Sequence, residues 1–95
     1  MFHDNTPPSK TVISCMITCR SVTYAQKYVK LLQQNGYPAY ARRLPAHLSD
    51  TGCGHAVSVR PNHIRPALSL LDFYGMGPLR VFCETSGGLL EEMML

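Results

Sequence analysis

Residues 11–36, TVISCMITCRSVTYAQKYVKLLQQNG, decide the fold because they join a predicted strand to a predicted helix. The opening TVISCMIT is rich in apolar and β-branched residues and has the length of a strand. Ser21 suits a helix N-cap, and Asn35-Gly36 is a typical helix end. Between them, apolar residues recur at helical spacing: Val22, Ala25, Val29 and Leu32.

The rest of the chain adds three more predicted strands, at residues 38–44, 55–60 and 78–84. Residues 45–54 are a loop by composition. A second helix is predicted within residues 61–75, opened by Pro61 and marked by a stripe of Ile64, Ala67, Leu68 and Leu71. Pro66 removes an amide donor there, so we expect a loose first turn or a later helix start.

This order, βαββαβ, predicts an α+β domain of the ferredoxin-like type. Its antiparallel sheet would have four strands in the order 4-1-3-2, with two helices on one face. We expect a flexible lead-in at 1–10, a single domain at 11–86, and a tail at 87–95 that is a short helix or unanchored. At one rim of such a sheet the topology gathers Cys19, Arg20, Ser21, the loop from His47 to His55, and the turn at 75–78.

Composition narrows the possible partners. The chain has 95 residues, 45% of them hydrophobic, and a net charge of +3. No basic run exceeds Arg42-Arg43 and there is no tryptophan, so nucleic acid is not expected as a partner, whereas small anions suit the charge. No apolar stretch reaches the roughly 18 residues of a membrane span, and a cytoplasmic location with reduced cysteines and no disulfide is expected.

Two of the four cysteines are predicted to be core residues. Cys15 shares a strand face with Ile13 and Ile17, and Cys83 lies in an apolar strand. Cys19 ends the first strand just before the helix. It either completes the core or acts as a partner thiol, since a helix N-terminus favours a thiolate.

Cys53 differs because it lies in the polar loop sequence TGCGH, residues 51–55. Gly52 and Gly54 allow φ > 0 or a close approach, and His55 follows. The predicted topology also brings the positive end of the helix near this cysteine. These conditions favour a thiolate, which attacks sulfur or carbonyl centres. Alternatively, Cys53 only fills a turn position between glycines that form a tight hairpin.

Other residues have simpler interpretations. Cys15-x3-Cys19 has no second paired spacing, which argues against zinc, and His3 and His63 are expected to be solvated. Arg42 and Arg43 alternate faces, so one at most reaches the rim. Several apolar residues would face outward from the helix-free side of the sheet and suggest a homodimer: Val12, Met16, Tyr40, Ala56 and Phe82.

From about Val12 to Phe82 the chain resembles the selenium/sulfur carrier protein-like family. The resemblance rests on Ser21 and Ala25, on NGYP at 35–38, on Pro45, and above all on Cys53-Gly54 followed by HAVSVRP. It departs at Val22, Val29 and Gly52, where members usually have threonine, glutamate and serine. It implies the ferredoxin-like fold and makes Cys53 the residue that holds sulfur or selenium.

The sequence therefore predicts a carrier, rather than a turnover enzyme, that holds a persulfide or selenosulfide on Cys53. A cysteine desulfurase would be a suitable donor, and Cys19 is the candidate resolving thiol. The residues expected to bind around the sulfur are Arg20, Ser21, His47, Gly52, Gly54 and His55. No resident cofactor or metal is expected. A non-catalytic module that binds small anions or a protein, and a thiol-based metal or redox regulator, are the alternatives.

Overall fold

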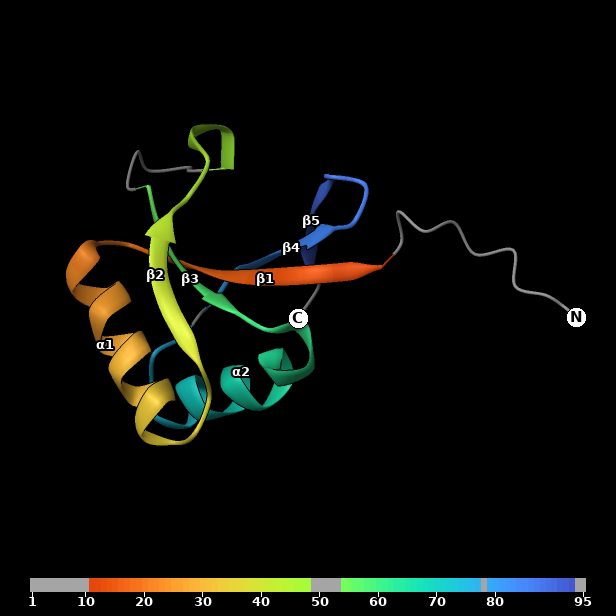
Figure 1. Ribbon diagram of the computed structural model, residues 1–95. Coiled ribbons are helices and arrows are strands. Elements are labelled where there is room, and N and C mark those ends of the chain that lie inside the picture. The colour runs from red at the N-terminus through yellow and green to blue at the C-terminus, as the bar shows by residue number, and fades with distance from the viewer. Residues whose placement is uncertain (1–10, 49–53, 78, 94–95) are drawn as a thin grey trace, which may run out of the picture.

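The computed structural model describes residues 11–48, 54–77 and 79–93. Within them, five strands form one antiparallel sheet in the order β2-β3-β1-β4-β5, accompanied by helices α1 and α2 (Figure 1). The elements are β1 Val12–Cys19, α1 Val22–Gln34, β2 Ala39–Arg43, η2 Ala46–Leu48, β3 His55–Val59, η3 Pro61–His63, α2 Ile64–Phe73, β4 Val81–Thr85 and β5 Leu90–Met93. Neither described helix is long and apolar enough to cross a membrane.

The α+β class with an antiparallel sheet is confirmed, but the prediction of four strands was wrong. The described sheet has a fifth strand at its edge, so its order read from that edge is 5-4-1-3-2, which keeps the predicted order 4-1-3-2 for the first four strands. The chain after β4 turns at Gly88, which has φ +86, and returns as β5 along the free edge of β4. The amide of Gly88 donates to the carbonyl of Thr85 at 2.9 Å and closes this turn. Part of the segment expected to be a short helix or an unanchored tail is therefore an edge strand.

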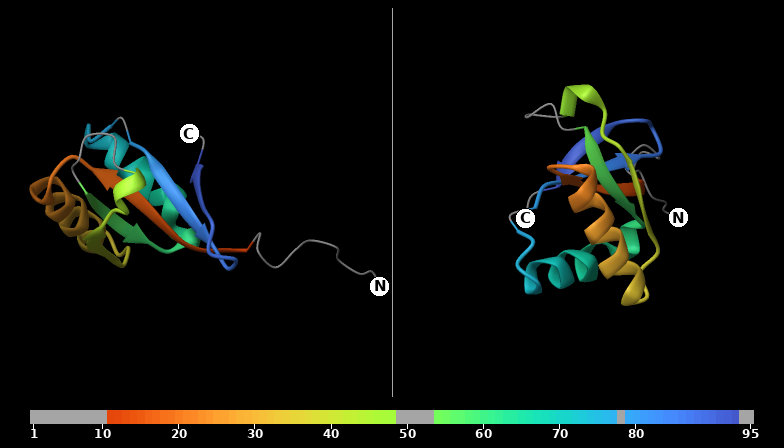
Figure 2. Two further views of the ribbon diagram at one scale, coloured as in Figure 1. Left: turned by 90° about the horizontal axis from the view of Figure 1, so that it is seen from above. Right: turned by 90° about the vertical axis from the view of Figure 1, so that its left-hand side faces the viewer.

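Both helices cover one face of the sheet (Figure 2). α1 buries Ala25, Tyr28 and Leu32, and α2 buries Ile64, Ala67 and Leu71, as the apolar stripes predicted. The later start of α2 is confirmed, because the 3₁₀ turn η3 precedes it. Pro66 then falls in the first turn of α2, where amides have no partner inside the helix.

The opposite face has a small core of its own, so it does not present the apolar surface that suggested a homodimer. Met16, Ala56 and Phe82 are buried against Leu44, with Leu48 and Leu90 packed alongside. The outward placement of these three residues was wrong, because η2 and the β4–β5 hairpin return over this face (Figure 1). Val12 and Tyr40 are exposed as predicted. Homodimer formation stays a prediction, without this apolar face as its basis.

A β-bulge near the start of β1 changes which residues share a face. Val12 pairs with Thr85 and Ser14 pairs with Glu84, so one residue of β1 is extra. That residue is Ile13, which is 54% exposed and does not join Cys15 and Ile17 in the core. The predicted placement of Ile13 was wrong, because strand alternation fails across a bulge.

Candidate functional site at the rim of the sheet

Three neighbouring strands place a row of polar side chains at one rim of the sheet. Cys19 of β1 lies directly opposite His55 of β3, and His55 lies opposite Arg43 of β2. Directly opposite residues share a face of the sheet, so the three form one row. Just beyond it, the carbonyl of Gly54 accepts a hydrogen bond from the amide of Leu44 at 2.8 Å. We call this place the rim, made of Cys19, Arg20, Ser21, Arg43, Gly54 and His55.

The N-terminus of α1 contributes positive charge to the rim. Ser21 follows β1 by two residues, and its Oγ accepts a hydrogen bond from the amide of Tyr24 at 3.2 Å, as the N-cap prediction required. The first turn of α1 carries no acidic residue. The partial positive charge of the helix end therefore adds to the charges of Arg20 and Arg43, and the rim suits an anionic ligand.

Cys19 packs into the core at the rim. It is 6% exposed, and its Sγ donates a hydrogen bond to the carbonyl of Ile17 at 3.6 Å. The structure shows that this thiol is part of the core, as one of the two interpretations of the sequence expected. Its role as a partner thiol stays a prediction. Its register opposite His55 nevertheless brings it next to the strand that leaves the Cys53 loop.

Two tyrosines of α1, Tyr24 and Tyr28, lie next to the rim, and the sequence interpretation missed them. The Tyr28 hydroxyl donates to the carbonyl of Met76 at 3.2 Å, which ties α1 to the predicted turn at 75–78. Burial, and secondly the charge of nearby Cys19, raise the pKa of Tyr28, while Arg20 opposes them. Arg20 also lies 5.1 Å from the centroid of the Tyr24 ring. The signal was the i, i+4 spacing of the two tyrosines just after the N-cap.

Not every predicted site residue reaches the rim. His47 is exposed on η2, which packs on the other face of the sheet from Cys19. Cys53 and Gly52 lie outside the described residues. Gly54 does not have a positive φ, and a Cβ added there would meet the carbonyl oxygen of Leu44 at 3.5 Å, an ordinary contact. Conformational freedom is therefore not what requires a glycine at position 54.

The other histidines and the arginine pair can be placed as well. Arg43 shares the rim row, whereas Arg42 lies opposite Ala56 on the other face, which agrees with the prediction that one arginine at most reaches the rim. His63 is not fully solvated: its Nδ1 is buried with no hydrogen-bond partner among the described residues, and its ring lies 5.6 Å from that of Tyr37. His3 lies outside the described residues.

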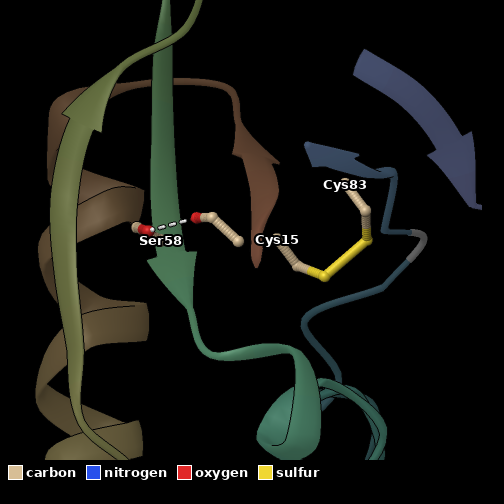
Figure 3. Close-up of a disulfide and its surroundings, with 4 residues drawn as sticks. Cys15, Ser58 and Cys83 are labelled. Atoms are coloured by element: carbon tan, nitrogen blue, oxygen red, sulfur yellow. Dashed lines mark hydrogen bonds between the residues drawn. A yellow bond between two sulfur atoms is a disulfide. The ribbon is translucent and has the colours of Figure 1, made fainter. Parts of the chain in front are cut away.

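Cys15 and Cys83 form a disulfide between β1 and β4, so the prediction that both are reduced was wrong (Figure 3). The two residues are direct partners in the sheet register, with their Cα atoms 4.1 Å apart. Their place at the core is confirmed for Cys15, which is 1% exposed, while Cys83 is partly buried. The sequence did not reveal the pair, because the register of β1 against β4 sets it.

A family model described as "Putative Se/S carrier protein-like" matches residues 14–83. The chain belongs to this family. The match confirms the predicted resemblance and runs from β1 to β4, so it includes the rim and the Cys53-Gly54 pair but not β5. Neither the curated proteins nor the solved structures include a match to the chain.

Metal binding was one alternative, and it would need converging ligands. Among the described residues, no three His, Cys, Asp or Glu side chains gather in a way that could hold a metal ion. Cys19 and His55 are adjacent in register, but His47 lies on the far side of the sheet. The described part of the rim therefore offers a thiol, an imidazole and cationic groups rather than a ligand cluster.

Proposed function

We propose that this protein carries sulfur or selenium as a persulfide or selenosulfide on Cys53. The observation that carries the proposal is the family match over residues 14–83, which spans Cys53-Gly54 and bears the name of a selenium or sulfur carrier. Cys15 and Cys83 are joined in the disulfide and Cys19 is buried in the core, so the remaining cysteine of the sequence is Cys53. It is therefore the residue to which we assign the cargo.

The rim supports this assignment through its charge. Gly54 follows Cys53 in the sequence and directly precedes β3. Its carbonyl accepts a hydrogen bond from the amide of Leu44, which fixes its position. Arg20, Arg43 and the N-terminus of α1 meet at the same rim. Positive charge favours a thiolate and would also stabilise a persulfide anion, which is the form that transfers sulfur.

The loading step needs no external oxidant or reductant. The Cys53 thiolate attacks the terminal sulfur of a persulfide on a donor enzyme such as a cysteine desulfurase. The sulfur–sulfur bond of the donor breaks, its cysteine leaves as a thiolate, and Cys53 becomes a persulfide. A selenium atom would be carried in the same way as a selenosulfide. Transfer to an acceptor thiolate repeats this exchange in the forward direction.

Cys19 is the proposed resolving thiol. As a thiolate it would attack the inner sulfur of the Cys53 persulfide, form a Cys19–Cys53 disulfide and release hydrosulfide. Its partner in the sheet, His55, follows Cys53 by two residues, which supports this pairing. Because Cys19 is 6% exposed, the end of β1 has to open first, so we expect this step to be slower than transfer to an external thiol.

Intact-mass measurement tests the carrier function. The wild-type protein, incubated with a cysteine desulfurase and cysteine, is expected to gain one sulfur atom. Cys53→Ser should gain none, whereas the matched variant Cys19→Ser should load normally and release less hydrosulfide without added thiol. A wild-type protein that takes up no sulfur, or a Cys53→Ser protein that loads equally, would contradict the proposal. Anion binding that persists in Cys53→Ala without any loading would instead support a non-catalytic binding module.

A further inference from the structure

A second sulfur site lies near the middle of the sheet, away from the rim. The Cys15–Cys83 disulfide lines a surface hollow of about 320 Å³ between the sheet and the start of α2. Figure 3 shows the disulfide on the side of the sheet that faces this helix. Val12, Ile64 and Met93 make the wall mostly apolar. The hollow gives a small molecule a route to the disulfide from solvent.

The two sulfurs of this disulfide are not equally accessible. Cys15 lies on the central strand and is 1% exposed, whereas Cys83 is partly exposed on β4. Beyond β4, the described sheet ends in the short edge strand β5. A thiol that enters the hollow therefore reaches Cys83 first, and attack there makes Cys15 the leaving sulfur.

Among the described residues, the two charged side chains that line the hollow are both acidic. Glu91 of β5 is the direct sheet partner of Cys83 and shares its face. Glu92 also lines the hollow, but Arg80 pairs with it at 2.9 Å. Arg60 and Arg65 neighbour lining residues in the sequence without lining the hollow themselves. Within the part of the chain that the structure describes, Glu91 is thus the unbalanced charge beside Cys83, and it should repel an anionic thiol.

We propose that Cys15–Cys83 is a redox-active disulfide that exchanges with uncharged or cationic thiols entering this hollow. A thiolate attacks Sγ of Cys83, a mixed disulfide forms there, the Cys15–Cys83 bond breaks, and Cys15 leaves as a thiolate that takes a proton from water. A second thiolate attacks the small-molecule sulfur of the mixed disulfide and releases Cys83. The net reaction converts two small thiols into their disulfide and the protein disulfide into a dithiol. This proposal does not depend on Cys53.

Thiols of different charge test the site in a Cys53→Ser background. Cysteamine, 2-mercaptoethanol and 2-mercaptoethanesulfonate are each reacted with the folded protein, followed by alkylation and peptide mass mapping. The first product is expected to carry the small thiol on Cys83 and the alkyl group on Cys15. Each rate is divided by the rate at which the same thiol reduces a small reference disulfide. After this correction cysteamine should react about tenfold faster than the sulfonate. The Coulomb energy between Glu91 and a unit charge about 6 Å away in water changes the rate roughly threefold, and the two thiols differ by two unit charges.

Two variants and one denaturant series make the outcome decisive. Glu91→Gln should remove most of the charge preference, whereas Glu84→Gln, on the opposite face of β4, should keep it. If the folded protein is the species that is reduced, the rate of reduction does not change at low urea concentrations. If the protein must unfold globally first, the rate rises steeply with the urea concentration. Reaction only at unfolding concentrations of urea, or a first adduct on Cys15, would overturn the site. Equal corrected rates for the three thiols would overturn its proposed selectivity.

Discussion

Reduction of the Cys15–Cys83 disulfide should destabilise the protein strongly, because the bond joins residues 68 positions apart. Closing a loop of that length removes about 4 kcal/mol of chain entropy from the unfolded state at 25 °C. Domains of this size are stable by about 5–15 kcal/mol in total. Reduction should therefore remove between roughly a quarter and four-fifths of the free energy of unfolding of the oxidised protein.

Urea unfolding of a Cys53→Ser protein, with and without a phosphine reductant, measures this effect. A loss of about 4 kcal/mol lowers the midpoint by roughly 2 to 4 M urea when the slope is about 1–2 kcal/mol per M. The Cys15→Ala/Cys83→Ala variant is the matched control, since its midpoint should not respond to the reductant. Intact mass after alkylation confirms the redox state of each sample.

Equal midpoints for the oxidised and reduced proteins would refute this reasoning. So would alkylation of Cys15 and Cys83 in the purified protein before any reductant is added, because the disulfide would then be absent. A shift in the double-alanine control would show that the reductant acts elsewhere in the chain.

Three further predictions concern the rim and the helix ends. Because the pKa of Tyr28 is raised in the folded state, its contribution to stability is complete below about pH 10 and is lost as the pH rises through the folded-state pKa. Tyr28→Phe should therefore flatten the alkaline fall in the free energy of unfolding, whereas the control Tyr24→Phe should not. Ser21→Ala should lower the free energy of unfolding by about 1 kcal/mol in urea titrations, through loss of the N-cap hydrogen bond. Gly54→Ala should leave the thermal midpoint nearly unchanged, whereas Gly36→Ala, at φ +86, should lower the midpoint through a loss of about 1 kcal/mol in the free energy of unfolding. Equal effects of the two variants would contradict the assignment of a positive φ to Gly36 and not to Gly54.

The sequence predicted the first strand, both helices and the strand order around them, because each had a local signal. Ser21 and Asn35-Gly36 delimit α1, and the Pro61 opening marks the approach to α2. The fifth strand had no such signal. Its sequence, LEEM, does not alternate, and pairing with β4 and the Arg80–Glu92 ion pair hold it. Those interactions are visible only once β4 is in place.

The candidate site was predictable where topology alone decides it. Cys19, Ser21 and His55 meet because strand ends and a helix start share one rim. His47 could not be assigned, since the path of η2 over the other face depends on packing of Leu44 and Leu48. The disulfide was missed for a related reason: the register of β1 against β4 brings the two cysteines opposite each other, and no local signal in the sequence reveals that register.

The most direct test of the carrier proposal is the pH dependence of Cys53 alkylation, followed by peptide mass mapping. A positively charged rim should make Cys53 reactive well below pH 8.5, about the ordinary pKa of a thiol. Arg43→Gln should move the profile toward higher pH, with Arg42→Gln, on the other face, as the matched control. A Cys53 profile centred at or above pH 8.5, unchanged by Arg43→Gln, would contradict the proposal that the rim holds a reactive sulfur.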